Sequence, residues 1–509
     1  MKYLDPAIAF GARLATIEKP VRYLGGESGS VVKENPVLTI ALCFPDVYEI
    51  GMTNNAMKIL YAGLNAIDGV QCERVFSVGS DYEALLRGTG TRLYGLETGR
   101  QLADFDILAF TVGYELAATN IVGVLDLGGI QIRRSLRSVS EPLVIAGGPA
   151  ITNPVPYTDI LDGVWVGEAE NAFFELARIL MELKKDGASR HELREALQKN
   201  PAVWIAGKRA VRHVHEDFAD APFSYSFPVP NVKPVQNHGV VEIMRGCPNG
   251  CRFCHAGYFY RPQRFRSVDM ILKDVETLVV EHGYREITLS SLSTGDYPGL
   301  PMLLQILNQR WSAGGISFQL PSLKVESFKL ELIEQVSGVR KSGLTFAIET
   351  PDPEWQKSVN KMASFDKIVE ILDTAARRGY RVAKLYFMTG LPGPEKNDIS
   401  DTSSDMPEIS EYSEEADLIV SFIKNMGSRV SGLNLNVTIA TFVPKPHTPY
   451  QWSRQLPLEK SYATVYRIKD AFRKDSRVKI TYHDPFMSML ECMMARGDER
   501  AGNLVLSAW

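Results

Sequence analysis

The sequence predicts an α/β protein in which a proline-rich linker joins two β/α regions. From about residue 36 to residue 170, short β-branched runs alternate with helical patterns, and the alternation returns after residue 239. Such alternation is typical of parallel sheets covered by helices. Between the two regions, residues 217–238 contain four prolines with aromatic residues between them, which indicates an ordered linker wrapped on a surface.

The first region has four predicted strands and three predicted helices. This pattern predicts a doubly wound, Rossmann-like domain with a parallel sheet and helices on both faces. We expect strands at Val37–Phe44, Ile107–Val112, Leu143–Ala146 and Gly163–Val166, and helices at Asn54–Ala66, Leu116–Gly128 and Glu170–Leu183.

The second region alternates strand and helix six times. Six such units fall short of the eight that close a TIM barrel. The acidic stretch Glu395–Glu415 after the fifth strand is interpreted as a solvated loop insertion. We expect strands at Gly239–Met244, Glu286–Leu292, Ile316–Lys324, Gly343–Ile348, Arg381–Met388 and Leu433–Phe442, and helices at Val268–Glu281, Leu300–Trp311, Lys329–Val336, Phe365–Arg378, Glu414–Lys424 and Leu458–Arg473.

These patterns divide the chain of 509 residues into five segments. We expect an N-terminal extension at 1–35, the Rossmann-type domain at 36–210 and the linker at 211–238. The second β/α domain is expected at 239–455, and a C-terminal helix and strand cap at 456–509.

Composition limits the compartment and the partners. The formal charge of −4 gives no electrostatic argument for nonspecific nucleic-acid binding. No stretch is long and apolar enough to span a membrane, and the N-terminus lacks the apolar region of a signal peptide. Six cysteines are too few for a disulfide-stapled secreted fold. We therefore expect a cytoplasmic protein that does not contact membranes.

Three cysteines within eight residues form the most informative motif. Cys247, Cys251 and Cys254 directly follow the first apolar strand of the second region, with the spacing C-x3-C-x2-C. Four cysteines complete the coordination of a cubane iron–sulfur cluster, so three leave one iron open to a ligand from outside the protein. An open iron allows a cluster to do chemistry on a bound molecule. The three cysteines are therefore the predicted metal ligands and catalytic residues.

A structural zinc site is the main alternative interpretation of this loop. A Cys3His site could recruit His255, but adjacent residues such as Cys254 and His255 rarely converge on one tetrahedral ion. Zinc motifs usually consist of two spaced pairs, and the chain has no second pair. The remaining cysteines are expected to be small core residues: Cys43, Cys72 and Cys492.

The three-cysteine loop resembles the signature of the radical S-adenosylmethionine (radical SAM) enzymes. The resemblance implies a [4Fe-4S] cluster whose open iron chelates the amino and carboxylate groups of SAM. Reduction of the cluster then cleaves SAM to methionine and a 5′-deoxyadenosyl radical, which removes a hydrogen atom. The resemblance also implies an open, partial (β/α)6 TIM-like barrel and a low-potential electron donor such as a flavodoxin or ferredoxin.

The same resemblance assigns SAM contacts to the loops that follow the other barrel strands. The aromatic residue between the last two cysteines is expected to shield the cluster and touch adenine, and two serines after the second strand are candidates for the amine contact. The glutamate that ends the fourth strand either binds SAM or forms a structural ion pair, and the glycines after the fifth strand either approach the ligand or form an ordinary turn. The implied SAM contacts are Phe253, Ser291, Ser293, Glu349, Gly390, Gly393 and Val443.

Two further loops of this region have alternative interpretations. Thr441–Trp452 contains three prolines flanked by aromatic groups, so it either walls a ligand pocket with Lys445 and His447 or only forms a rigid exit from the barrel. Tyr260–Ser267 interleaves arginines with aromatic residues. Such a loop could grip a phosphate or nucleic acid, but it is more typical of a solvated loop with ion pairs.

The N-terminal domain resembles a cobalamin-binding domain. The run Asp46–Gly51 (Asp-Val-Tyr-Glu-Ile-Gly) and the later Gly-Gly are similar to the Asp-x-His-x-x-Gly and Gly-Gly fingerprint of that family. There the histidine replaces the lower base on cobalt; here Tyr48 occupies its position, which excludes imidazole ligation. The alternative is a degenerate domain kept for substrate docking or packing. The implied cobalamin contacts are Asp46, Tyr48, Gly51, Thr111, Gly147 and Gly148.

From about Pro36 onward, the chain resembles one group of radical SAM proteins with an N-terminal cobalamin-binding-like domain. This group is often fused to, or encoded beside, a further C-terminal domain of unknown function, which implies a possible partner protein. We expect an enzyme that methylates an unactivated carbon of an unknown substrate, with cobalamin carrying the methyl group. The alternatives are a radical oxidation, rearrangement or sulfur insertion without methyl transfer, and a redox- or cofactor-sensing iron–sulfur protein that never cleaves SAM.

Overall fold

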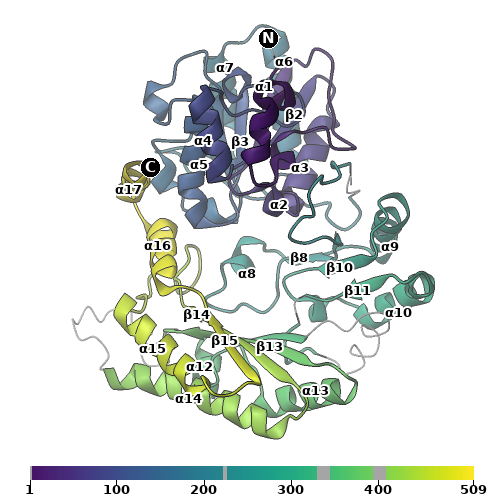
Figure 1. Ribbon diagram of the computed structural model, residues 1–509, viewed down its shortest axis with the longest axis vertical. Helices are drawn as coiled ribbons and strands as arrows, with labels where there is room; N and C mark the ends of the chain where they lie inside the picture. Colours follow the sequence, from purple (N-terminus) through teal and green to yellow (C-terminus); the bar gives the residue numbers. More distant parts are fainter. Residues whose placement is uncertain (1–2, 222–225, 322, 329–343, 394–408) are drawn as a thin grey trace. The chain divides into compact units, whose positions relative to one another are not determined.

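The computed structural model describes residues 3–221, 226–321, 323–328, 344–393 and 409–509. The chain forms two compact units, the first comprising Met1–Asp217, Ala221–Asn237 and Gly497–Trp509, and the second Phe218–Asp220 and His238–Arg496 (Figure 1). The segment 456–509, which the sequence predicts as one cap, is thus divided between the units. No helix among the described residues has the length and apolar composition that crossing a bilayer requires.

The first unit contains a six-stranded sheet in the order β2-β1-β3-β4-β5-β6. The first five strands are parallel, and β6 is antiparallel to β5. The order 2-1-3-4-5 is the flavodoxin-like arrangement of the doubly wound fold, so the predicted fold class is confirmed. The strands are β1 Leu38–Phe44, β2 Val70–Phe76, β3 Ile107–Thr111, β4 Leu143–Gly147, β5 Gly163–Trp165 and β6 Val203–Trp204.

Strand β2 is missing from the sequence prediction because it carries charged residues, yet all seven of its residues are buried. Arg74 is fully buried and pairs with Glu27 at 2.9 Å and with Glu97 at 2.6 Å. Glu27 belongs to the N-terminal extension and Glu97 to the segment that precedes β3. The charge is therefore compensated by residues distant in sequence, which makes its burial possible.

Helices connect the strands of this sheet, and the last helix of the chain, α17, also belongs to this unit. Helix α17 packs against α5 and against the turn Val155–Tyr157. A Cβ atom at Gly502 would lie 2.0 Å from the carbonyl oxygen of Pro156, so this approach requires glycine. The helices of the first unit are α1 Pro6–Phe10, α2 Tyr48–Gly51, α3 Asn55–Asn65, α4 Ser80–Thr89, α5 Ala118–Leu127, α6 Ala172–Lys185, α7 Arg190–Lys199 and α17 Glu499–Ala508.

The second unit contains two parallel sheets, β11-β10-β7 and β12-β13-β14-β15, and a short hairpin of β8 and β9. No closed barrel is present among the described residues. The six predicted strands are found, and β15 adds a seventh parallel strand after the last predicted helix. The strands are β7 Gly239–Glu242, β8 Met244–Arg245, β9 Arg264–Phe265, β10 Glu286–Ser290, β11 Ser317–Gln319, β12 Leu344–Glu349, β13 Val382–Thr389, β14 Asn434–Thr441 and β15 Val478–Tyr482.

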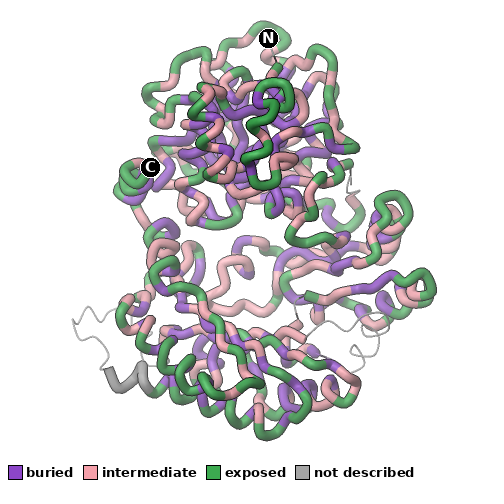
Figure 2. Tube along the Cα trace, in the orientation of Figure 1, coloured by how far each residue is buried: buried purple, intermediate pink, exposed green. Residues whose placement is uncertain are grey.

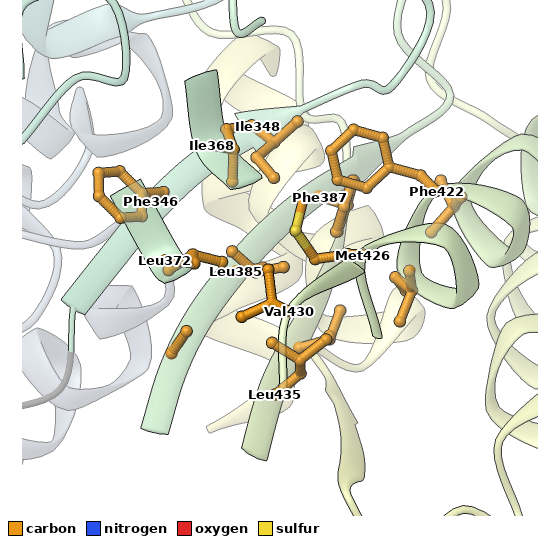
Figure 3. Packing of buried hydrophobic residues seen from close by; sticks show 14 of the residues in the cluster. Phe346, Ile348, Ile368, Leu372, Leu385, Phe387, Phe422, Met426, Val430 and Leu435 are labelled. Carbon is orange, nitrogen blue, oxygen red and sulfur yellow. The ribbon is translucent and has the colours of Figure 1, made fainter. Parts of the chain in front are cut away.

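Helices pack on the larger of these sheets to form the main core of the second unit. Figure 3 shows Phe346, Leu385 and Leu435 from three neighbouring strands meeting Leu372 of α13 and Met426 of α14. Along β13 and β14, buried residues alternate with intermediate or exposed ones, and β15 has no buried residue. Figure 2 shows the same mixture of buried, intermediate and exposed residues along this part of the chain. The predicted helix Lys329–Val336 and most of the acidic stretch Glu395–Glu415 lie outside the described residues. The helices are α8 His255–Phe259, α9 Val268–Glu276, α10 Leu300–Trp311, α12 Pro353–Ser358, α13 Phe365–Arg377, α14 Ile409–Arg429, α15 Leu458–Ala471 and α16 Pro485–Arg496.

Candidate functional site

The three cysteines lie on one loop that begins at the end of β8 and ends at α8. Cys254 is the N-cap residue of α8, and its Sγ accepts a hydrogen bond from the Gly257 N–H at 3.4 Å. All three thiols are free and half-buried. The backbone holds the loop in place, since the Arg252 N–H donates to the carbonyl oxygen of Val359 at 3.0 Å.

Asn249, inside the cysteine loop, connects this loop to two other strand ends. Its Nδ2 donates to Cys247 Sγ at 3.3 Å, to Ser293 Oγ at 3.2 Å and to Asp296 Oδ2 at 3.0 Å. Its Oδ1 accepts from Lys324 Nζ at 2.9 Å. Ser293 and Asp296 follow β10, and Lys324 follows β11, so the network joins the cysteine loop to the segments after two neighbouring strands of one sheet.

A buried ion pair lies on the other side of the cysteines. Lys361 Nζ is 2.6 Å from Glu349 Oε1 and 5.8 Å from the centre of the Phe253 ring. Burial raises the pKa of the Cys251 and Cys254 thiols, and the Lys361 ammonium acts against this rise. Glu349 has φ of +68°, in the left-handed region that a glutamate rarely adopts, at a bulge of β12.

These features fit an iron–sulfur cluster with three thiolate ligands. N–H groups of Asn249 and Gly257 donate to two of the sulfur atoms, and the Lys361 ammonium lies near the thiols. Both features are expected at a site that stabilises the negative charge of thiolates. The described residues contain no group of three or more His, Cys, Asp or Glu side chains converging on a single ion. The ring of His255, the candidate fourth zinc ligand, stacks on Phe259 with 5.6 Å between centroids.

Removing the Lys361 ammonium is expected to destabilise the loop and to lower the reduction potential of the cluster. Lys361→Gln leaves Glu349, which is 8% exposed, without its cation, at a cost on the order of 2 kcal/mol. The potential falls because a positive charge that favours the reduced cluster is lost. Thermal unfolding and a redox titration followed by electron paramagnetic resonance measure the two effects.

Lys357→Gln is the matched control for this prediction. Lys357 pairs with Glu354 at 2.6 Å, but both side chains are exposed, and such a surface pair contributes about 0–1 kcal/mol. An equal shift of potential in both variants would show that only the net charge matters and would refute the local role of Lys361.

The two serines predicted to contact SAM differ in their surroundings. Ser293 is buried, reaches Asn249 of the cysteine loop and donates to Asp296 Oδ2 at 2.7 Å. Ser291 is bonded within its own loop, because its Oγ lies 2.9 Å from Thr294 Oγ1. Only Ser293 is therefore joined to the cysteines.

Phe253 packs against a small apolar group at the ends of β13 and β14. The buried members of this group are Val359, Leu391, Phe442 and Tyr450, and Trp355 and Met388 are partly buried against it. Val443, also predicted to contact SAM, is half-buried and directly follows Phe442. Gly393 lies beside Trp355, since a Cβ atom there would be 3.5 Å from Nε1 of the indole.

Gly390 has a structural partner that the sequence does not indicate. Its N–H donates to both carboxylate oxygens of Glu415 on α14, at 3.1 Å each. Gly390 has φ of +76°, and a Cβ atom there would lie 2.9 Å from the Leu456 side chain. The N–H of Gly390 is thus used inside the second unit, and the approach of its backbone to SAM stays a prediction.

The wild-type protein is expected to lose stability as pH rises, and replacing Glu415 by glutamine is expected to abolish this pH dependence. Burial raises the pKa of Glu415 from 4.5 to about 8, although the Gly390 N–H acts against this rise. Between these values the folded protein holds a proton that the unfolded chain releases, so wild-type stability declines as pH rises through this range and then levels off. Glu415→Gln keeps an acceptor for Gly390 and should show no such decline.

The midpoint of thermal unfolding, measured for both proteins at about pH 6 and about pH 9, tests this expectation. The midpoint temperature of the variant should increase relative to that of the wild type as pH rises. A difference that stays constant or shrinks would contradict the assignment.

The two loops with alternative interpretations are occupied by contacts within the second unit. Lys445 Nζ pairs with Glu491 of α16 at 2.6 Å, whereas His447 is exposed. Arg266 is fully buried in an ion pair with Asp274 at 2.7 Å. Arg261 donates to the carbonyl oxygen of Gly257 and lies 4.2 Å from the centre of the Tyr258 ring, so this loop is packed rather than extended toward a nucleic acid.

In the first unit, the candidate cobalamin contacts follow β1, β3 and β4. Asp46 Oδ1 accepts from the Val47 N–H at 2.7 Å and shapes the turn after β1. Tyr48 is 1% exposed; its hydroxyl donates to Glu27 at 3.0 Å and accepts from the Asn231 N–H at 3.0 Å. The Tyr48 side chain is therefore engaged inside the first unit, and a cobalamin contact at this position stays a prediction.

Glycines bring the ends of β3 and β4 close together. Gly148 has φ of +118° and ψ of 170°, and a Cβ atom there would lie 2.3 Å from the carbonyl oxygen of Val112. Gly113, next to Val112, has open space where its Cβ would be. Gly147 ends β4 beside Thr111, which is buried at the end of β3. Glycines therefore line this carboxyl edge of the sheet and hold the turns after β3 and β4 close together.

Gly51 has a packing role beside the end of β2. A Cβ atom on Gly51 would lie 2.2 Å from the Phe76 ring, so α2 can approach the end of β2 only with glycine here. The structure gives Gly51 this packing role, and its cobalamin contact stays a prediction.

Sequence reasoning missed four polar residues around the cysteines. Asn249 stands inside the C-x3-C spacing, and Asp296 ends the polar run Ser-Leu-Ser-Thr-Gly-Asp after β10, so both carried a signal. Lys324 and Lys361 lie in loops without a recognisable pattern. Their roles become visible only through the contacts of the folded chain.

Two family models match the chain. A model of N-terminal regions of radical SAM proteins matches residues 56–206, and a model of the radical SAM superfamily matches residues 241–406. An uncharacterised protein of Methanocaldococcus jannaschii is 25% identical over 472 residues, which are 91% of this chain and 89% of that protein. A tRNA-2-methylthio-N(6)-dimethylallyladenosine synthase of Bacteroides thetaiotaomicron is 37% identical over 117 residues, 21% of this chain and 26% of that protein.

Two solved structures have a similar fold along 92% of the chain. One is the radical SAM methyltransferase TsrM from Kitasatospora setae with cobalamin and a [4Fe-4S] cluster bound, at a TM-score of 0.55, 12% identity and 99% coverage of TsrM. The other is the cobalamin-dependent SAM radical enzyme OxsB with aqua-cobalamin bound, at a TM-score of 0.52, 13% identity and 66% coverage of OxsB. The two family models and the three-cysteine loop lead to one conclusion: this chain belongs to the radical SAM superfamily of enzymes.

Proposed function

We propose that the protein is a cobalamin-dependent radical SAM enzyme that methylates an unactivated carbon. The observation that carries the proposal is the pairing, in one chain, of a three-cysteine loop with a flavodoxin-like sheet that has a glycine-lined carboxyl edge. In sheets of order 2-1-3-4-5, ligands bind beside β1 and β3, where the winding direction changes. TsrM and OxsB, which share the fold, hold cobalamin.

In this proposal the residues of the chain bind and orient the reactants. When bound, the cluster and SAM supply a hydrogen-abstracting radical, and cobalamin supplies a methyl group. Asn249 holds the cysteine loop against Ser293, whose hydroxyl would accept a hydrogen bond from the SAM amine. Phe253 and the apolar group behind it exclude water from the adenine side. An external flavodoxin or ferredoxin delivers the electron.

At the cobalamin edge, recognition relies on the backbone. The Tyr48 hydroxyl is used inside the domain, so this side chain would not serve as a ligand to cobalt. Gly113 has open space where its Cβ would be and would leave room for a ligand beside the turn that Gly148 packs against Val112. Asn120 steadies this edge by donating to the carbonyl oxygen of Pro45 at 2.9 Å.

Sulfur insertion is the second candidate, because a tRNA-2-methylthio-N(6)-dimethylallyladenosine synthase matches 117 residues of the chain. This reaction requires a sulfur source, which proteins commonly hold with cysteine thiolates. The only cysteines of the first unit are Cys43 and Cys72, and both are buried in its core. This observation favours methyl transfer.

The experiment needs no knowledge of the substrate. Protein purified without oxygen is loaded with iron and sulfide, offered hydroxocobalamin, freed of excess corrin and given SAM and a low-potential reductant. Methyl transfer predicts a retained corrin spectrum, S-adenosylhomocysteine that depends on cobalamin, and 5′-deoxyadenosine that disappears in the Cys247, Cys251, Cys254 triple alanine variant. Formation of deoxyadenosine without retained corrin and without S-adenosylhomocysteine would support the second candidate. Absence of both deoxyadenosine and S-adenosylhomocysteine would refute the proposal that the protein is an enzyme.

A further inference from the structure

The first unit contains a cavity of about 420 Å³ lined by four arginines. It lies where β4 and β5 begin, because Arg134 and Arg137 precede β4 and the remaining arginines belong to α7. Gly148 directly follows β4, so the cavity is at the opposite edge of the sheet from the proposed cobalamin site. The other lining residues are small, apolar or amide side chains, and none is acidic or aromatic.

Two of the arginines build the wall. Arg137 has no exposed side-chain surface and donates to Asp162 Oδ2 at 3.0 Å and to backbone carbonyl groups at 2.8 and 2.9 Å. Arg190 donates to the carbonyl oxygen of Pro142 at 3.0 Å and approaches the same Asp162 oxygen at 3.4 Å. One carboxylate oxygen therefore serves two guanidinium groups.

The other two arginines have no acidic partner. Within the described part of the chain, the guanidinium groups of Arg134 and Arg194 make no hydrogen bond and no ion pair, although both residues are half-buried. Arg194 is close enough to Arg190 to lower the pKa of Arg190 by repulsion, in addition to the larger effect of burial. Holding four guanidinium groups around one cavity costs free energy through mutual repulsion and burial unless an anion is bound there.

We propose that this cavity binds a compact polyanion through a diphosphate group. Arg134 and Arg194 offer two planar guanidinium forks, each of which matches one phosphate in a bidentate manner. The cavity has no aromatic side chain on which a base could stack, so recognition is directed at the phosphates. The group is supplied either by inorganic diphosphate or by a nucleoside diphosphate. This site is independent of the cobalamin and SAM sites.

Titration calorimetry on the full-length, cluster-loaded protein tests the proposal with inorganic diphosphate, ADP, AMP, orthophosphate and an oligoglutamate peptide. Diphosphate or ADP should bind, and AMP and orthophosphate should bind at least about tenfold more weakly. The double variant Arg134→Gln, Arg194→Gln should lose about tenfold or more in diphosphate affinity for each arginine. Arg137 and Arg190 are left intact because they hold the fold.

The control is the double variant Arg133→Gln, Arg178→Gln, which removes the same charge from outside the cavity. Arg133 pairs with Asp159 at 3.1 Å and Arg178 with Glu175 at 3.1 Å, both on the surface. Unchanged diphosphate binding in this control supports the site, and tighter binding of ADP than of diphosphate identifies a nucleotide as the source. Equal losses in both double variants, equal affinity for orthophosphate, or binding of oligoglutamate alone overturns the proposal.

Discussion

Replacing Cys251 by alanine is expected to give a folded protein that has lost its iron–sulfur cluster. The loop does not depend on the thiol for its shape, because Asn360 Nδ2 donates to the carbonyl oxygens of Asn249 at 2.9 Å and Gly250 at 3.1 Å. The Cys254 N–H also donates to the carbonyl oxygen of residue 251, a bond that alanine preserves. Two thiolates cannot hold a cubane that needs three, so iron and sulfide should fall to less than about a tenth of the wild-type content.

Iron and acid-labile sulfide assays, circular dichroism and the yield of 5′-deoxyadenosine measure this expectation. Cys492→Ala is the matched control, since Cys492 is a half-buried free thiol on α16, outside the loop. The control should keep both its cluster and its deoxyadenosine yield. Full iron content in the Cys251 variant would show that Cys251 is not a ligand, and loss in both variants would point to misfolding instead.

The sequence predicts this site well because its ligands are local. Eight consecutive residues carry all three cysteines, so no tertiary contact is needed to recognise them. The α/β class is likewise predictable, because buried parallel strands are short apolar runs such as Leu38–Phe44 and Ile107–Thr111. Each of these signals is complete within one segment of the chain.

What the sequence does not predict depends on contacts between distant segments. Strand β2 looks polar in the sequence because it contains Arg74. Its burial depends on ion pairs of Arg74 with Glu27 and Glu97, which lie 47 and 23 residues away. Tyr48 occupies the position of a cobalt ligand in the fingerprint, but its hydroxyl donates to Glu27 of the N-terminal extension inside the first unit. Lys361 gains its place near the cysteines only through the fold. Spacing alone therefore predicts the cluster ligands but not the charged and polar groups that surround them.

Replacing Gly148 by alanine is expected to destabilise the first unit and abolish cobalamin binding while leaving the cluster intact. With φ of +118° and ψ of 170°, Gly148 occupies a region that is essentially restricted to glycine. A Cβ atom 2.3 Å from the carbonyl oxygen of Val112 would force the backbones after β3 and β4 apart. We expect a loss on the order of 3 kcal/mol in stability and no retained corrin.

Gly88→Ala separates this local effect from a general response to substitution. Gly88 lies in α4 with ordinary φ and has nothing within 4 Å of the added Cβ atom, so alanine should stabilise the helix by about 0.5–1 kcal/mol. Cobalamin retention and thermal unfolding of both variants are compared with their iron content, which should equal that of the wild type. If Gly148→Ala kept its corrin despite the lost stability, the ligand could not rest against the turn after β4, and the cobalamin site would have to be sought elsewhere in the first unit.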